Sequence, residues 1–133
     1  MDLRRDFELS EQDKQFLDNY ELPWETIVDG SPWVLIHGLA TPPGYNQRKV
    51  TAAIRMEAGY PHSELNMVYF LPGLSRSDGR PIGCANVPQL IDGKTYQRWS
   101  RHRTARNAWK PGFDSLETHV YLIEDWLDRE FEK

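Results

Sequence analysis

Hydrophobic residues recur along this chain in patterns that predict two helices flanking a set of strands. Ser10 and Asp13 resemble a capping pair, so a short helix is expected to begin at Ser10 and to end before Pro23, which cannot continue it. The apolar face of this helix consists of Phe16, Leu17 and Tyr20.

Three hydrophobic runs after this helix predict strands. Residues 33–39 are rich in β-branched and aromatic side chains, which indicates a strand buried on both faces. Apolar and polar residues alternate over residues 49–56 and again over 65–70, the period of a half-buried strand. Turn-forming proline and glycine residues separate the runs, so we expect the strands to form an antiparallel meander.

Residues 71–112 show no periodicity and contain many glycines and prolines, which predicts a long irregular segment. Such a segment inside a compact domain is usually functional or disordered. Four large apolar side chains are available to pin it to the body of the protein, so we expect it to be ordered and to hold the active site. These side chains are Leu90, Tyr96, Trp99 and Trp109.

The last predicted element is a helix with one apolar stripe. Asp114 and Glu117 place negative charge at its expected start, where the helix dipole favours it. We expect the stripe to pack against the sheet rather than to bind a partner. It comprises Leu116, Val120, Ile123, Leu127 and Phe131, widened by Trp126. In order, the elements predict an α+β fold with a short N-terminal helix, an antiparallel meander, a long irregular active-site segment and a C-terminal helix.

The length of 133 residues suits one domain, so we expect a single domain over residues 1–133, with residues 1–8 as a flexible N-terminal extension. No apolar run approaches the ~20 residues of a membrane-spanning helix. The charged start of the chain lacks the apolar core of a secretory signal. Cys84 is the only cysteine, so an internal disulfide and a thiolate zinc site are excluded. A cytoplasmic protein is therefore expected.

Charge is distributed unevenly along the chain. The net charge is −4, yet residues 94–110 hold six basic residues and no acidic one. These are Lys94, Arg98, Arg101, Arg103, Arg106 and Lys110. The rest of the chain holds ten basic and twenty acidic residues. This asymmetry indicates either an anionic partner or a loop that pairs with the protein's own acids.

Cys84 is the strongest nucleophile in the sequence, because part of a thiol is ionised at neutral pH. Arg76 and Arg80 lie close to it in sequence, and nearby positive charge favours the reactive thiolate. A lone cysteine is also often a small buried hydrophobic residue, and the sequence leaves both interpretations open.

His102 lies among cations in the run Arg98-Trp-Ser-Arg-His-Arg, which favours its neutral form. A neutral imidazole there would serve as a base or a hydrogen-bond donor, with a plain surface histidine as the alternative. We expect His37 to be a hydrogen-bonded core histidine and His119 to be structural or solvent-facing. No metal-ligand spacing is present, so no metal site is predicted.

Two further kinds of site have weaker support. Three serines are possible hydroxyl nucleophiles, although no Gly-x-Ser-x-Gly elbow accompanies them. They are Ser75, Ser77 and Ser100. Basic residues interleaved with Tyr96, Trp99 and Trp109 have the chemistry to bind single-stranded nucleic acid, but the overall acidity argues against nucleic acid as a partner.

Several local sequences resemble the ubiquitin-conjugating (UBC) fold. They are Gly38-Leu-Ala-Thr-Pro-Pro-Gly-Tyr-Asn, the turn Gly59-Tyr-Pro, the strand end Tyr69-Phe-Leu-Pro and the glycine-punctuated segment with Cys84. The chain is most similar to a bacterial branch, prokaryotic ubiquitin-conjugating family E, in the run Gln97-Arg-Trp-Ser-Arg-His-Arg followed by Trp109-Lys-Pro-Gly-Phe-Asp. The resemblance covers roughly residues 9–130.

The resemblance implies a helix before a four-stranded meander, and a conjugating enzyme (an acyltransferase) that needs no cofactor. A ThiF-like activating enzyme would pass a ubiquitin-like protein to Cys84 as a thioester, for transfer to an amine. Such families lie in bacterial operons that also encode JAB-type peptidases, and some of these operons are associated with antiphage defence.

The sequence departs from this family pattern at the active site. Leu71-Pro72-Gly73 replaces the His-Pro-Asn motif, so the asparagine that supports the oxyanion is absent, and loss of one such donor costs about 10²–10³ in rate. We expect His102 to supply that group or to act as base. The expected substrate-binding residues are Arg98, Trp99, Arg101 and Arg103.

Two alternatives stay open. Cys84 lies further from Pro72 than the family pattern has it, so a serine is the alternative acyl acceptor. The alternative function is a catalytically inactive UBC-like scaffold or adaptor for ubiquitin-like proteins, in which Cys84 would be buried.

Overall fold

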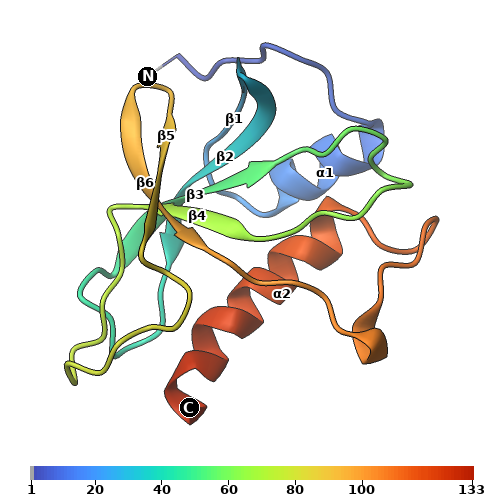
Figure 1. Cartoon of the computed structure of the whole chain (residues 1–133). Helices are drawn as coiled ribbons and strands as arrows, with labels where there is room; N and C mark the ends of the chain where they lie inside the picture. The colour runs from blue at the N-terminus through green and yellow to red at the C-terminus, as the bar shows by residue number, and fades with distance from the viewer. Residues whose placement is uncertain (1) are drawn as a thin grey trace.

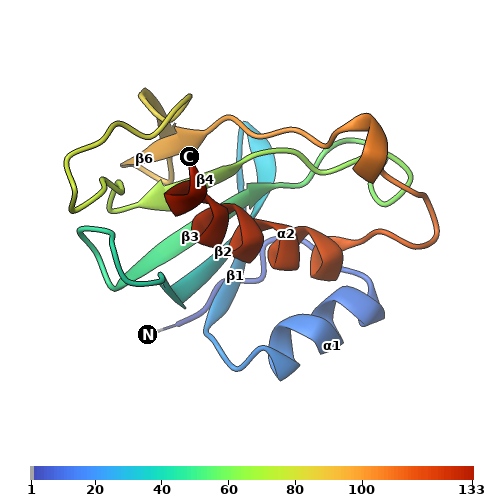
Figure 2. The same cartoon turned by 90° about the horizontal axis from the view of Figure 1, so that it is seen from below.

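A computed structural model describes residues 2–133. These residues form a six-stranded antiparallel sheet, with α1 and α2 packed on one of its faces (Figures 1 and 2). The strand order is β1-β2-β3-β4-β6-β5. The elements are α1 (Glu11–Asn19), β1 (Trp24–Asp29), β2 (Ser31–Ala40), β3 (Lys49–Arg55), β4 (Val68–Leu71), β5 (Val87–Ile91), β6 (Lys94–Trp99), η1 (Ala105–Asn107), α2 (Leu116–Arg129) and η2 (Glu130–Glu132). The predicted α+β class and the predicted meander are confirmed, with β1 to β4 as consecutive neighbours.

The hydrophobic pattern located the first helix and three of the strands. The Ser10 Oγ accepts the backbone N–H of Asp13 at 3.1 Å, which caps α1 as predicted. In β2, Val34 and Ile36 belong to the core under the helices, while Trp33 and Leu35 belong to a core on the other face. The strand is therefore buried on both faces.

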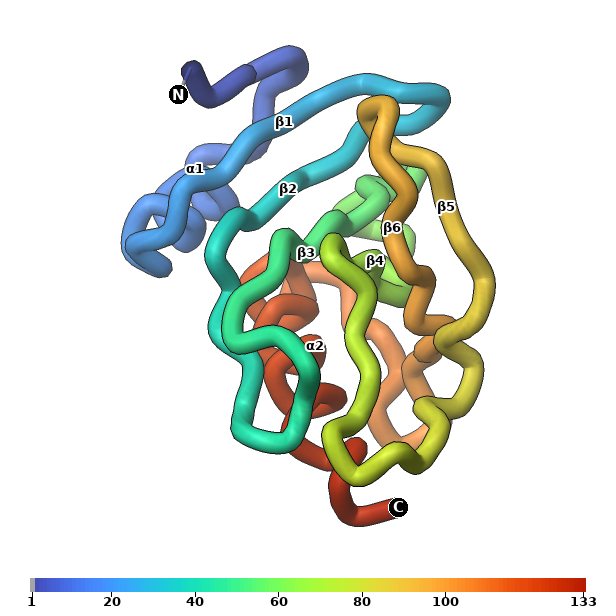
Figure 3. The backbone as a smooth tube through the Cα atoms, turned by 90° about the vertical axis from the view of Figure 1, so that its left-hand side faces the viewer, coloured from blue at the N-terminus to red at the C-terminus, as the bar shows by residue number. Residues whose placement is uncertain are grey.

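The sheet curls, and this curl creates the second core. The hairpin β5–β6 folds back toward β1 and β2, as the tube in Figure 3 shows. The Asp92 N–H at the hairpin tip donates to the Asp29 side chain at 2.8 Å, which joins the tip to the turn after β1. The core enclosed by the curl contains Ile27, Trp33, Leu35, Ala53, Tyr69, Ile91 and Tyr96.

The prediction of a long irregular segment over residues 71–112 was wrong, because the segment contains the hairpin β5–β6. Asp92 and Gly93 form its two-residue turn, with φ of 55° and 74°. An Asp-Gly pair is a strong hairpin signal, since both turn residues need positive φ. Pro88 and the exposed Leu90 interrupt the expected alternation of β5 and hid the strand.

The C-terminal helix differs from its prediction at both ends, because α2 ends at Arg129 and Phe131, the last residue of the predicted stripe, lies in η2. Ser115, not Asp114, is the N-cap, and its backbone N–H donates to Thr118 Oγ1 at 3.0 Å. Asp114 instead accepts the N–H of Lys110 at 2.8 Å. The predicted stripe packs on the sheet, with all but the last of its residues buried.

The N-terminal segment is in contact with the sheet. The Asp6 N–H donates to the Thr26 carbonyl at 2.9 Å, and the Thr26 N–H donates to the Arg4 carbonyl at 3.1 Å. Residues 4–6 of the expected flexible extension therefore pair with β1. Within residues 2–133, no helix has the length and apolar character to cross a membrane.

Candidate functional site

Cys84 lies in the connection between β4 and β5, residues 72–86, which we call the thiol loop. Its side chain is exposed. Its backbone has φ of 52°, a left-handed conformation that is uncommon for residues other than glycine. Such backbone conformations cost free energy and cluster at functional sites, so the surrounding contacts must hold this turn.

The start of the Trp-Ser-Arg-His run holds the turn. The Ser100 N–H donates to the Cys84 carbonyl at 2.9 Å, and Arg101 Nη1 donates to the Gly83 carbonyl at 3.0 Å. His102 follows, is exposed, and makes no hydrogen bond within the described part of the chain. The fold thus brings the backbone of Cys84 against the segment that carries His102.

One buried carboxylate fixes two arginines beside the thiol loop. Glu130, which is 2% exposed at the end of α2, lies 3.4 Å from Arg101 and 3.6 Å from Arg76. Arg76 Nη1 also donates to the Glu130 carbonyl at 2.8 Å. We call these three residues the Glu130 cluster. It ties the thiol loop and the segment after β6 to the C-terminal end of α2.

Two shallow depressions lie along the thiol loop, with volumes of about 390 and 430 Å³. Both are lined by Ala85, Asn86 and Gln97. The Gln97 amide accepts the Leu74 N–H at 2.8 Å and donates to the Leu74 carbonyl at 2.9 Å, which fixes its orientation. The Asn86 side chain is exposed and makes no hydrogen bond among residues 2–133.

Asn86 is a polar group near the thiol that the sequence analysis missed. Its only signal in the sequence is its place two residues after Cys84, and an asparagine in a loop is too common to indicate a site. Asn86 lines both depressions along the thiol loop, so a molecule bound in either one would contact its side chain.

The predicted substrate-binding residues divide into three groups. Trp99 is fully buried, so its ring belongs to the core and is not available to a macromolecular substrate. Arg101 pairs with Glu130, and Arg103 pairs with Asp114 at 3.4 Å. Arg98 has no ion pair among the described residues. The positive charge of residues 94–110 is therefore neutralised in part by ion pairs with the protein's own acidic residues.

Of the three candidate serines, only Ser100 contacts the Cys84 turn. Ser75 and Ser77 lie earlier in the thiol loop, where the Ser75 carbonyl accepts the Asn46 N–H at 2.9 Å and the Ser77 N–H donates to the Gly44 carbonyl at 2.7 Å. These bonds attach that part of the loop to the turn after β2. Of the candidate acyl acceptors, Cys84 and Ser100 therefore lie next to each other, whereas Ser75 and Ser77 lie elsewhere in the loop.

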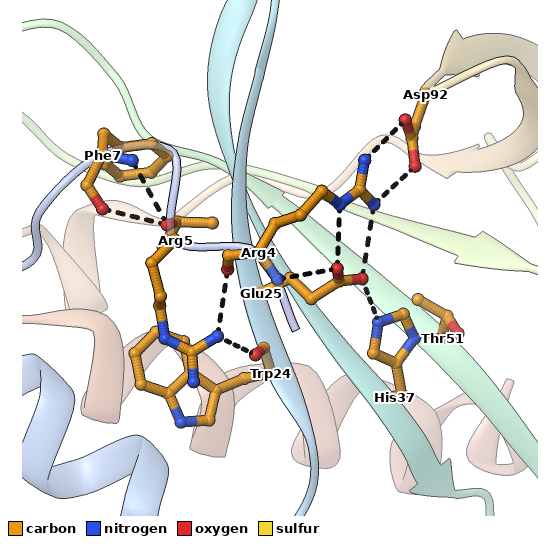
Figure 4. Close-up of polar contacts among 9 residues, drawn as sticks. Arg4, Arg5, Phe7, Trp24, Glu25, His37, Thr51 and Asp92 are labelled. Carbon is orange, nitrogen blue, oxygen red and sulfur yellow. Dashed lines mark hydrogen bonds and ion pairs between the residues drawn. The ribbon is translucent and has the colours of Figure 1, made fainter. Parts of the chain in front are cut away.

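A second polar cluster lies beside the hairpin β5–β6, around Glu25 (Figure 4). His37 is half-buried there, with Nε2 2.8 Å from Glu25 and Nδ1 3.0 Å from Thr51. The Arg4 guanidinium contacts Glu25 at 2.9 Å and Asp92 at 2.7 Å. The hydrogen bond from Arg4 lowers the pKa of Glu25 to about 2. Arg4 pairs with Glu25 of β1 and with Asp92 at the tip of the hairpin β5–β6. The cluster therefore joins the N-terminal segment to the sheet and has a structural role.

His119 is structural. It is fully buried, its Nε2 donates to the Met67 carbonyl at 2.9 Å, and burial lowers its pKa to about 4. Across residues 2–133, no group of three or more His, Cys, Asp or Glu side chains is placed to hold a metal ion.

Comparison with known proteins adds a family match to this geometry. The family model described as prokaryotic E2 family E matches residues 9–130. This range contains both α-helices and all strands of the sheet. No curated protein and no solved structure matches the chain.

Proposed function

Because the chain belongs to prokaryotic E2 family E, we propose that it accepts a ubiquitin-like protein on Cys84 as a thioester and transfers it to an amine. Membership of this family indicates a role in ubiquitin-like conjugation. The observation that carries the thioester step is the exposed Cys84 thiol on a left-handed turn. The backbone carbonyl of Cys84 accepts a hydrogen bond from Ser100, in the segment that also bears His102.

The proposed reaction consists of two acyl transfers. The Cys84 thiolate attacks the activated C-terminal carbonyl carbon of the ubiquitin-like protein, and the bond to the activating group breaks. A ThiF-like activating enzyme supplies this substrate. An amine then attacks the thioester, the Cys84 thiolate leaves, and the amine loses its proton to a base. Covalent catalysis of this kind divides one difficult step into two easier ones.

Both steps pass through a negatively charged oxygen that needs a hydrogen-bond donor. Leu74 and Trp99 hold the Gln97 amide in place, so its oxygen accepts two hydrogen bonds and its nitrogen already donates one. His102 and Asn86 have exposed side chains without hydrogen bonds in the described residues. His102 follows Ser100, whose N–H donates to the Cys84 carbonyl, by two residues, and Asn86 follows Cys84 by two residues. We assign His102 the role of donor or base, with Asn86 as a second donor.

The test mixes the protein with its ubiquitin-like partner, the activating enzyme and ATP, and follows adducts on denaturing gels. We expect an adduct that thiol reductants cleave and that Cys84→Ala abolishes. Cys84→Ser should trap an adduct that resists reductant but yields to hydroxylamine. A reductant-resistant, hydroxylamine-sensitive adduct that survives Cys84→Ala would overturn the assignment, and its loss in Ser100→Ala would assign the acyl group to that serine.

His102→Ala and Asn86→Ala separate the two donors. We expect loss of the main donor to slow discharge of a preformed thioester to lysine by about 10²–10³. The control is His62→Ala, because His62 is also exposed but lies in the loop between β3 and β4. Discharge at the unaltered rate in both variants would remove both residues from the mechanism.

The two alternatives fit the structure less well. A non-catalytic adaptor was expected to bury Cys84, whereas the thiol is exposed. A nucleic-acid surface needs aromatic rings on which bases stack, whereas Tyr96 and Trp99 are buried. Absence of any adduct, together with binding of the ubiquitin-like protein, would nevertheless favour the adaptor.

A further inference from the structure

An apolar groove of about 560 Å³ opens at the N-terminal end of α2. Its walls are the N-terminal segment with the start of α1, Val28 of β1 with Pro32 of β2, the loop after β3, and residues 112–115. Figure 2 shows the chain before α2 passing between α1 and the loop that follows β3. The apolar lining includes Phe7, Leu9, Val28, Met56, Pro61 and Phe113.

Two side chains of the groove are unusually exposed for their type. Phe113 is 71% exposed and Val28 is 60% exposed. Covering apolar surface is favourable by about 25 cal/mol per Å², so these side chains gain free energy when a partner buries them. Both side chains line the same groove, and concave sites lined by apolar side chains with a few polar groups are the usual form of binding sites.

The charge of the groove is one-sided. Its lining contains four acidic residues and no Lys, Arg or His. The acids are Glu8, Asp13, Glu57 and Asp114. All but Asp13 have a basic partner outside the groove: Lys14, Arg55 and Arg103 respectively. Asp13 has no ion pair within residues 2–133.

Asp13 is therefore a buried carboxylate without a counter-charge. It is 2% exposed, and its Oδ2 accepts a hydrogen bond from the Tyr60 hydroxyl at 2.8 Å. Burial raises the pKa of this carboxyl group. A cation that enters the groove would stabilise the ionised form, because an opposite charge offsets the cost of desolvation.

We propose that this groove binds a segment of a partner protein in which an apolar side chain lies next to a lysine or arginine. The apolar side chain packs against Phe113 and Val28, and the cation faces Asp13. The groove is separate from the thiol loop, since α2, with 14 residues and a length of about 21 Å, lies between them. A partner is thus held while Cys84 stays accessible.

The test titrates the ¹⁵N-labelled full chain with blocked peptides that carry one Leu, Phe or Trp between two lysines. A matched set has glutamates in place of the lysines. We expect a lysine peptide to bind with a dissociation constant below about 1 mM and to shift amide resonances of residues 7–13, 56–61 and 112–115. The glutamate peptides should bind at least tenfold more weakly.

Variants locate the contact. Phe113→Ser and Asp13→Asn should each weaken the best lysine peptide at least tenfold, while Leu90→Ser should leave its affinity unchanged. Leu90 is the matched control, because it is 64% exposed on β5, outside the groove. If Asp13→Asn fails to fold, the comparison of lysine and glutamate peptides on the unaltered chain tests the charge preference instead.

Three results would overturn the proposal. They are no binding by any lysine peptide, equal binding of the glutamate set, and full affinity in Phe113→Ser. Sedimentation of the free protein tests a second copy as occupant, and a dimer lost in Phe113→Ser would also count against a heterologous partner. None of these readouts uses the thioester reaction, so they are independent of the proposed function.

Discussion

Cys84 and His119 show how local contacts decide the state of a reactive side chain. The Cys84 turn is held by a backbone hydrogen bond from Ser100 and a side-chain hydrogen bond from Arg101, and both leave the thiol in solvent. His119 lies on the buried face of α2, where one nitrogen bonds to Met67 and burial disfavours the charged ring. The fold thus leaves the thiol available for chemistry and excludes this imidazole from it.

The depressed pKa of His119 predicts a pH dependence of stability. In the unfolded chain a histidine takes up a proton near pH 6.5, whereas in the fold its pKa is about 4. Between these values the unfolded state binds more protons, so the free energy of unfolding falls as the pH is lowered. We expect His119→Gln to reduce the slope by up to one proton, about 1.4 kcal/mol per pH unit.

Urea unfolding at intervals from pH 7.5 to 4.5 measures this slope. His62→Gln is the matched control, because His62 is exposed and we expect its replacement to leave the slope unchanged. An equal slope in His119→Gln and the unaltered protein would show that another group causes the pH dependence.

The hairpin β5–β6 gives the thiol loop a fixed end. The thiol loop runs directly into β5, and β6 runs directly into the segment that contacts the Cys84 carbonyl. The two strands therefore bring Cys84 and Ser100 together by pairing. A distortion at the turn would be carried along both strands toward the thiol.

Gly93 tests this element. Its φ of 74° is costly for residues with a Cβ, so we expect Gly93→Ala to lower the free energy of unfolding by about 1–2 kcal/mol. Gly83→Ala is the control, because an added Cβ there meets open space and Gly83 has no positive φ. Chemical denaturation of both variants measures the difference, and equal losses would refute the turn as the cause.

Hydrophobic periodicity predicted the elements whose burial follows a regular pattern, and it failed where polar residues are buried. It located α1, β2, β3 and the stripe of α2, because their apolar residues recur at the expected spacing. It missed β1, where Glu25 and Thr26 are buried through hydrogen bonds to Arg4 and to the N-terminal segment. It also could not predict that Arg101 and Arg103 pair with distant acids, since these contacts exist only after folding.

The complete fold joins segments that are far apart in the sequence, and Glu130 is one point of junction. It lies beyond α2, yet it contacts Arg76 before the hairpin and Arg101 after it. The environment of Cys84 therefore depends on the C-terminal end of the chain. Sequence spacing gives no signal for this, because the three residues belong to three separate segments.

Glu130→Gln should loosen the thiol loop as well as destabilise the protein. Arg76 keeps its ion pair with Asp78, but Arg101 loses its carboxylate partner, so we expect a loss of about 1–3 kcal/mol in the free energy of unfolding. Asp125→Asn is the matched control: its pair with Arg129 on α2 is half exposed, and such pairs contribute at most about 1 kcal/mol. Hydrogen exchange under native conditions distinguishes the two effects. Faster exchange at Ser100, whose N–H bonds to Cys84, with unchanged exchange in β2 would show local loosening, and unchanged exchange at Ser100 would contradict the role of Glu130 at the thiol loop.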